Sequence, residues 1–111
     1  MNTPEQLQSS AGEAAALLKA MSNPNRLMIL CMLCETPRAS AGELARVTGL
    51  SPSATSQHLA RMRDEGLIGS EREAQRIHYF ITHPAVQQII TTLKTIYWPI
   101  RSRHDYRHSF S

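Results

Sequence analysis

The stretch from Ser51 to Arg63, SPSATSQHLARMR, offers hydroxyl, amide and guanidinium groups and contains no carboxylate. Groups of these types donate hydrogen bonds to base edges and to phosphate oxygens. Phosphate contacts are electrostatic, so the absence of negative charge favours a nucleic-acid partner. The alternative is the solvated polar face of an ordinary surface helix, and the flanking elements favour DNA binding over it.

Helical spacing divides this stretch into two faces. Thr55, Leu59 and Met62 recur at intervals of four and three residues, so they are predicted to point inward. His58 lies beside that inward face, where a packed and hydrogen-bonded imidazole is favoured over a direct base contact. The opposite face is left to polar and cationic side chains.

Two helices joined by a tight turn must position this face. Ser40 and Glu43 form a capping box, which predicts that the first helix begins at Ser40. Gly49 marks its end, because glycine accepts the left-handed conformation found at helix C-termini. Ser51 and Pro52 then provide an N-cap and a first helical residue for the second helix, which Gly66 closes. This order predicts a helix-turn-helix, whose second helix enters the major groove.

The segment from Leu67 to Ile81 is rich in residues that suit strands, on either side of a charged stretch near Glu71 to Arg76. It predicts a β-hairpin, the wing of a winged helix. The tip lacks an Asn-Gly or Asp-Gly pair, so the position of the turn stays open. Its arginines are predicted to touch a minor groove or phosphates, whereas Gln75 could equally belong to a solvated tip.

The expected DNA contacts come from the second helix and the wing. Ser53, Ser56 and Gln57 are predicted to read bases, and the arginines to contact phosphates or a groove. The full set is Ser51, Ser53, Ser56, Gln57, His58, Arg61, Arg63, Arg72, Gln75 and Arg76.

Two further helices, from Gln6 to Met21 and from Pro84 to Pro99, flank these elements, and another runs between Pro24 and Pro37. The last helix could simply cover the core, but a domain of this size has limited core to offer to both flanking helices, so a symmetric homodimer through them is favoured. The expected interface residues are Leu17, Leu18, Ile89, Ile90, Leu93 and Tyr97.

The length of 111 residues allows one compact domain, predicted over residues 1–98, followed by a polar, basic tail over residues 99–111 that we expect to be mobile. The net charge of +3 is compatible with a nucleic-acid partner. No apolar run matches a membrane helix and the N-terminus does not resemble a secretory signal, which predicts a cytoplasmic protein with reduced cysteines.

The motifs LLKAMSNPNRLMIL, SAGELARVTGLSPSATSQHLARMRDEGLI and REAQRIHYFI resemble the ArsR/SmtB family of bacterial winged-helix repressors. Within it, ALLKAM, ILCML and LKTIYW are most similar to the branch of YgaV, BigR and HlyU. The resemblance covers about Ala14 to Trp98. It implies a homodimer that binds operator DNA, with Ser53, Ser56, Gln57 and His58 among the recognition-helix contacts.

The same branch senses reactive sulfur or oxidants through two cysteines, which implies Cys31 as a redox-sensing candidate. The family's second cysteine position is Trp98 here, and tryptophan cannot form the bridge. Cys34 lies one turn from Cys31, a spacing that does not suit a disulfide within an intact helix. The alternative is that both cysteines are small buried hydrophobic residues.

A metal-responsive repressor and a regulator without inducer sensing are alternative interpretations. Cys31 and Cys34 could supply thiolates, and His104 and His108 share one face if the tail is helical, but the family's C-x-C and D-x-H metal patterns are absent. No metal and no cofactor are therefore predicted. The chain also lacks G-x-S-x-G, H-E-x-x-H and Gly-rich phosphate motifs, so an enzyme is not expected. The sequence predicts an α+β winged helix-turn-helix, mostly helical with a two-stranded wing.

Overall fold

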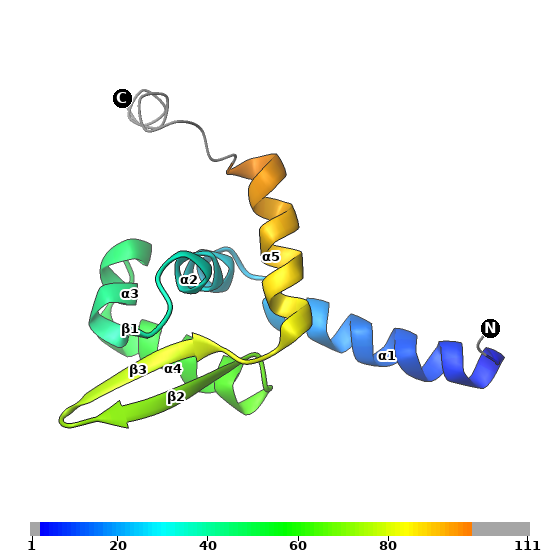
Figure 1. Ribbon diagram of the computed structural model, residues 1–111, viewed down its shortest axis with the longest axis horizontal. Helices are drawn as coiled ribbons and strands as arrows, with labels where there is room; N and C mark the ends of the chain where they lie inside the picture. Colours follow the sequence, from blue (N-terminus) through cyan, green and yellow to red (C-terminus); the bar gives the residue numbers. More distant parts are fainter. Residues whose placement is uncertain (1–2, 99–111) are drawn as a thin grey trace.

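The computed structural model describes residues 3–98, which form helices around a small antiparallel sheet (Figure 1). The predicted tail over residues 99–111 lies outside the described part. The elements are α1 (Pro4–Met21), α2 (Pro24–Glu35), β1 (Ala39–Ser40), α3 (Ala41–Thr48), α4 (Pro52–Asp64), β2 (Ile68–Glu73), β3 (Arg76–Ile81) and α5 (Pro84–Tyr97). None of the helices in residues 3–98 has the length and apolar character to cross a membrane.

The start and end signals of α3 and α4 lie where the sequence predicts them. Ser40 and Glu43 form a reciprocal capping box: Ser40 N donates to Glu43 Oε1 at 2.9 Å, and Glu43 N donates to Ser40 Oγ at 3.2 Å. Gly49 ends α3 with a φ of 74°, a left-handed conformation that costs glycine little. Ser51 caps α4, since its Oγ accepts from Ala54 N at 3.1 Å. The helix-turn-helix is thus fixed by local chemistry.

The sheet has three strands in the order β1-β3-β2, one more than the two-stranded wing predicted. Ala39 pairs with Tyr79 and Ser40 with His78, so the residues just before α3 are hydrogen-bonded to the hairpin. A two-residue strand has no readable alternation, which is why the pattern of the sequence missed it. The charged stretch near Glu71 to Arg76 also lies mostly within β2 and β3 rather than between them.

The hairpin turns at Ala74 and Gln75, with Ala74 at a φ of 59°. A tight two-residue turn needs positive φ values, which Asn or Gly would supply more cheaply than alanine. The turn therefore uses a left-handed non-glycine residue, and the usual sequence signal is missing. The hairpin projects from the body on the side opposite to α1 (Figure 1).

The core is aliphatic and joins α2, α3, α4 and α5 with the base of the sheet. Its fully buried side chains are Ile29, Leu30, Leu44, Leu59, Met62, Leu67, Val86, Ile90 and Thr55. Burial of each Leu, Ile or Met side chain stabilises the fold by about 1.5–3 kcal/mol. The inward prediction for Thr55, Leu59 and Met62 is confirmed, so the outward face of α4 is fixed by the core beneath it.

The helix α1 lies mostly outside this core and extends away from the body (Figure 1). Only Ala20 and Met21 of α1 are buried, and Leu18 is 54% exposed. One residue of the predicted dimer interface needs correction. Ile90 is completely buried within the protomer, so it packs in the core and has no surface left for a partner.

Candidate nucleic-acid interface

The outward face of α4 is a polar ridge. Ser53, Ser56, Gln57 and Arg61 are all exposed on it, as is the capping residue Ser51. Thr55, Leu59 and Met62 of α4 turn inward on the opposite side, where they anchor the helix. An exposed, uncharged-to-cationic helix face with a fixed orientation has the form that fits a DNA major groove.

Thr55 fastens the start of this helix. Its Oγ1 donates to the carbonyl oxygen of Ser51 at 3.0 Å, and the side chain is completely buried. The hydroxyl is therefore satisfied within the first turn and cannot serve a base. Ser51 accepts a second hydrogen bond in the same turn, because its Oγ accepts from Ala54 N. The two bonds together stabilise the first turn of α4.

His58 is half-buried and hydrogen-bonded, as the sequence favoured. The Nε of Arg26 donates to His58 Nδ1 at 3.3 Å, and the same guanidinium donates through Nη1 to the carbonyl oxygen of Ala20 at 2.8 Å. Burial lowers the pKa of His58, and the charges of Arg26 and Arg61 lower it further. His58 is thus held neutral as an acceptor between α2 and α4.

Arg61 and Arg63 are exposed in the last turn of α4. Arg63 Nη1 donates to Ser70 Oγ at 3.3 Å, which joins the end of α4 to the start of the wing. Cations at a helix C-terminus also interact favourably with the helix dipole. Arg61 and Arg63 are both exposed, so each can also donate to a phosphate.

The wing places Arg72, Gln75 and Arg76 on exposed positions near its tip. An open cleft of about 690 Å³ separates this tip from the helix-turn-helix. Its walls are the cap Ser40, then Ala41, Glu43 and Arg46 along α3, Ser56 of α4, and Gln75, Arg76, Ile77 and Tyr79 of the wing. The cleft brings a predicted base-reading residue and a predicted phosphate-binding arginine to one surface.

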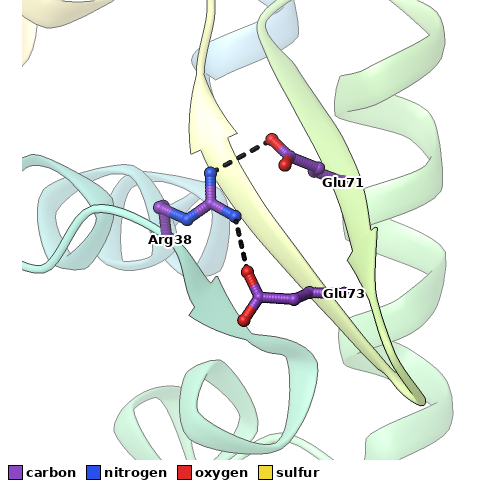
Figure 2. Close-up of polar contacts among 3 residues, drawn as sticks. All are labelled: Arg38, Glu71 and Glu73. Atoms are coloured by element: carbon purple, nitrogen blue, oxygen red, sulfur yellow. Dashed lines mark hydrogen bonds and ion pairs between the residues drawn. The ribbon is translucent and has the colours of Figure 1, made fainter.

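A cluster of opposite charges joins the wing to the residue that precedes β1. Arg38, just before β1, contacts Glu71 through Nη1 at 3.1 Å and Glu73 through Nη2 at 3.7 Å (Figure 2). The hydrogen bond and charge of Arg38 lower the pKa of Glu71, so this carboxylate stays ionised. Arg38 itself has a φ of 68°, unusual for a residue with a side chain.

The two cysteines lie in α2 as free, half-buried thiols. Burial raises the pKa of Cys31 above its ordinary value, while the ammonium of Lys94 opposes this and Glu35 adds to it. Lys94 Nζ lies 2.7 Å from Glu35 Oε1, which ties α5 to α2 beside the thiols. Both cysteines are therefore protonated thiols near a cation, not preformed thiolates.

Across residues 3–98, no group of three or more His, Cys, Asp or Glu side chains is arranged to hold a metal ion. His104 and His108, which the sequence raised as additional ligands, lie outside the described part of the chain. Cys31 and Cys34 alone provide fewer ligands than the four that zinc takes in structural sites.

Residues 23–70, from the cap of α2 to the start of the wing, match the family model of the bacterial regulatory proteins of the arsR family. The regulator YgaV of Escherichia coli (strain K12) is 70% identical over 94 residues, which cover 85% of this chain and 95% of YgaV. This chain belongs to the ArsR family. The resemblance inferred from its motifs, including the branch of YgaV, HlyU and BigR, is confirmed.

Other relatives of this ArsR-family chain carry different regulatory names. The transcriptional activator HlyU of Vibrio cholerae is 41% identical, over 84% of this chain and 85% of HlyU. The biofilm growth-associated repressor of Xylella fastidiosa is 36% identical, over 86% of this chain and 82% of that protein. A crystal structure of a predicted DNA-binding transcriptional regulator from E. coli superposes with a TM-score of 0.81 at 68% identity, covering 86% of this chain and all of that one.

The comparisons confirm the predicted α+β winged helix-turn-helix fold and the class of the protein, a transcriptional regulator rather than an enzyme. Sequence reasoning missed two cations of this ArsR-family site. Arg46 lines the cleft between α3 and the wing, and Arg26 holds His58. The position of Arg46 in the last turn of α3 was a readable signal, but nothing in the sequence relates residue 26 to residue 58.

Proposed function

We propose that this protein is a transcriptional repressor that binds a palindromic operator as a homodimer. The observation that carries the proposal is the exposed polar face of α4, which has no carboxylate before Asp64, the last residue of the helix, and rests on buried Leu59 and Met62. Side chains on such a face meet base edges without electrostatic repulsion from the phosphates. Membership of a family of bacterial DNA-binding regulators supports the same function, which is exercised in the cytoplasm.

Ser53, Ser56 and Gln57 are the proposed base-reading residues, because they are exposed and carry hydroxyl or amide groups. The wing and the end of α4 supply the charge for phosphate or groove contacts: Arg61, Arg63, Arg72 and Arg76, with Gln75 at the tip. Ser51 serves as the cap of α4 beside these contacts. His58 helps to position α4, because its ring accepts a hydrogen bond from Arg26 of α2 in the unbound protein.

The homodimer is proposed through α1 and α5. Much of α1 has no cover within the protomer, and Leu18 on α1 and Tyr97 on α5 are 54% and 69% exposed. Leu17, Ile89 and Leu93 are half-buried and pack against the core from the same two helices. Large apolar side chains gathered on two helices favour association of a second copy. A two-fold dimer repeats α4 in the manner that a palindromic operator requires.

An inducer response through Cys31 is the second part of the proposal. Cys31 is half-buried, and burial raises its pKa while the ammonium of nearby Lys94 partly opposes that rise. A small reactive sulfur species or oxidant would modify this thiol at the junction of α2 and α5. The competing candidates are a metal-responsive repressor and a regulator that has lost inducer sensing.

Footprinting on the protein's own promoter region, with and without a polysulfide, tests the proposal. We expect protection of two half-sites about one helical turn apart, and loss of that protection after treatment. Affinity should fall steeply as salt is raised, because phosphate contacts release counterions. The proposal of operator binding is refuted if no duplex forms a complex at low ionic strength. Protection that is unchanged by polysulfide would leave the operator proposal intact and remove the sulfur response.

A further inference from the structure

The wing does not carry net positive charge by itself. The segment from Ile68 to Ile81 contains two glutamates, Glu71 and Glu73, and two arginines, Arg72 and Arg76, so its formal charge is zero with His78 neutral. A hairpin whose charges sum to zero has no net attraction to a polyanion such as DNA, because its carboxylates offset what its arginines gain. The compensation has to come from outside the hairpin.

Arg38 is placed to provide it. The residue lies outside the hairpin, yet its guanidinium reaches Glu71 at 3.1 Å and Glu73 at 3.7 Å (Figure 2). One cation thus lies between two carboxylates, and the charge of the braced wing rises from zero to +1. All three side chains remain substantially exposed, at 42% for Arg38, 56% for Glu71 and 71% for Glu73, so solvent and salt screen the contacts.

The register of the hairpin shows why this matters for DNA contact. Glu73 stands directly opposite Arg76 across the β2–β3 pair. Oppositely charged side chains in that position attract each other across the strands. In the described residues Arg38 engages Glu73, and Arg76 makes no ion pair within 4.0 Å. Arg76 is therefore free to line the cleft that faces Ser56.

The backbone holds Arg38 in this place. Ala39, the next residue, is completely buried and pairs with Tyr79 of β3. Arg38 adopts a left-handed conformation with a φ of 68°, which residues with a Cβ adopt only when the surroundings impose it. Strained residues of this kind are often kept where their side chain has a task.

We propose that Arg38 is a positioning residue for DNA binding, whose single positive charge offsets part of the negative charge of Glu71 and Glu73 and engages Glu73, so that Arg76 and the wing can contact phosphates. This inference rests on the proposed function, since it names a further residue of the same interface. Arg38 acts through the two glutamates and makes no contact with DNA of its own.

The test compares Arg38→Ala, the double variant Glu71→Gln/Glu73→Gln and the triple variant that combines them. Each is titrated on an operator fragment over a range of salt concentrations. Alanine keeps the Cβ, so it retains the backbone strain at position 38 while it removes the guanidinium and the stem that carries it. Arg38→Ala is expected to weaken binding about three- to tenfold at low salt, because two carboxylates then oppose the phosphates. The weakening should shrink as salt is raised.

The two other variants decide the mechanism. The double variant should bind at least as tightly as the wild type, and the triple variant should match the double variant. A triple variant that is again three- to tenfold weaker would mean that Arg38 contacts DNA directly. A double variant as weak as Arg38→Ala would mean that the ion pairs only brace the wing. Either result overturns charge compensation, as does an unweakened Arg38→Ala. If wild-type protein binds no duplex, it is the proposed function that fails.

Discussion

Gln57 offers the sharpest test of base reading, because its side chain is exposed on α4 and does not belong to the buried core. A bidentate amide–adenine pair contributes about 1–3 kcal/mol of discrimination. Gln57→Ala should therefore reduce the preference for one base pair in each half-site by about 5- to 150-fold, since 1.4 kcal/mol corresponds to a factor of ten. The free energy of unfolding should change by less than about 0.5 kcal/mol, as for other exposed positions.

The measurement is selection from a library in which each operator position is randomised, carried out with wild type and Gln57→Ala at the same salt concentration. The variant should lose preference at one symmetric pair of positions and keep it elsewhere. Gln8→Ala is the matched control, since Gln8 is an exposed glutamine on α1, far along the chain from the helix-turn-helix. An unchanged set of base preferences would refute the assignment of Gln57 to base reading.

Three more outcomes follow from the site. Arg76→Ala should weaken binding to all sequences alike and reduce the magnitude of the salt slope by about 1 per protomer, whereas a change confined to one base pair would contradict a phosphate role. Cys31→Ser should keep operator affinity after polysulfide treatment that weakens the wild type, and equal loss in both proteins would remove Cys31 from the response. The lowered pKa of His58 means that the unfolded chain binds its proton first, so the stability from neutral His58 is present above about pH 6.5 and is lost as pH falls. Thermal melts at pH 8 and pH 5.5 should therefore show a smaller acid-induced drop for His58→Gln than for the wild type, and equal drops would exclude this linkage.

Local chemistry made the helix-turn-helix predictable. Ser40 and Glu43, Gly49, and Ser51 with Pro52 each act within four residues of themselves, and each signal has its expected partner in the structure. The inward face of α4 was readable for the same reason, because helical periodicity places residues on one side without any knowledge of their neighbours.

Features that depend on distant residues were not predictable. The contact of Arg26 with His58 spans 32 positions, and that of Arg38 with Glu71 spans 33. The strand β1 exists because β3 lies beside it, not because Ala39 and Ser40 prefer extended structure. Ile90 was assigned to a dimer interface because periodicity gives an apolar face but does not say which part of it the protomer's own core consumes.

The two-residue strand β1 has a mechanical consequence. Ser40 both pairs with His78 of β3 and caps α3, so the backbone couples the helix-turn-helix to the hairpin at this one residue. A chemical modification between α2 and α5 would therefore not easily bend the hairpin relative to the helix-turn-helix. In the proposed dimer, it would instead rotate the helix-turn-helix and wing of each protomer as one unit and change the separation of the two α4 helices, so that control would operate through the mismatch between that separation and the helical repeat of the duplex.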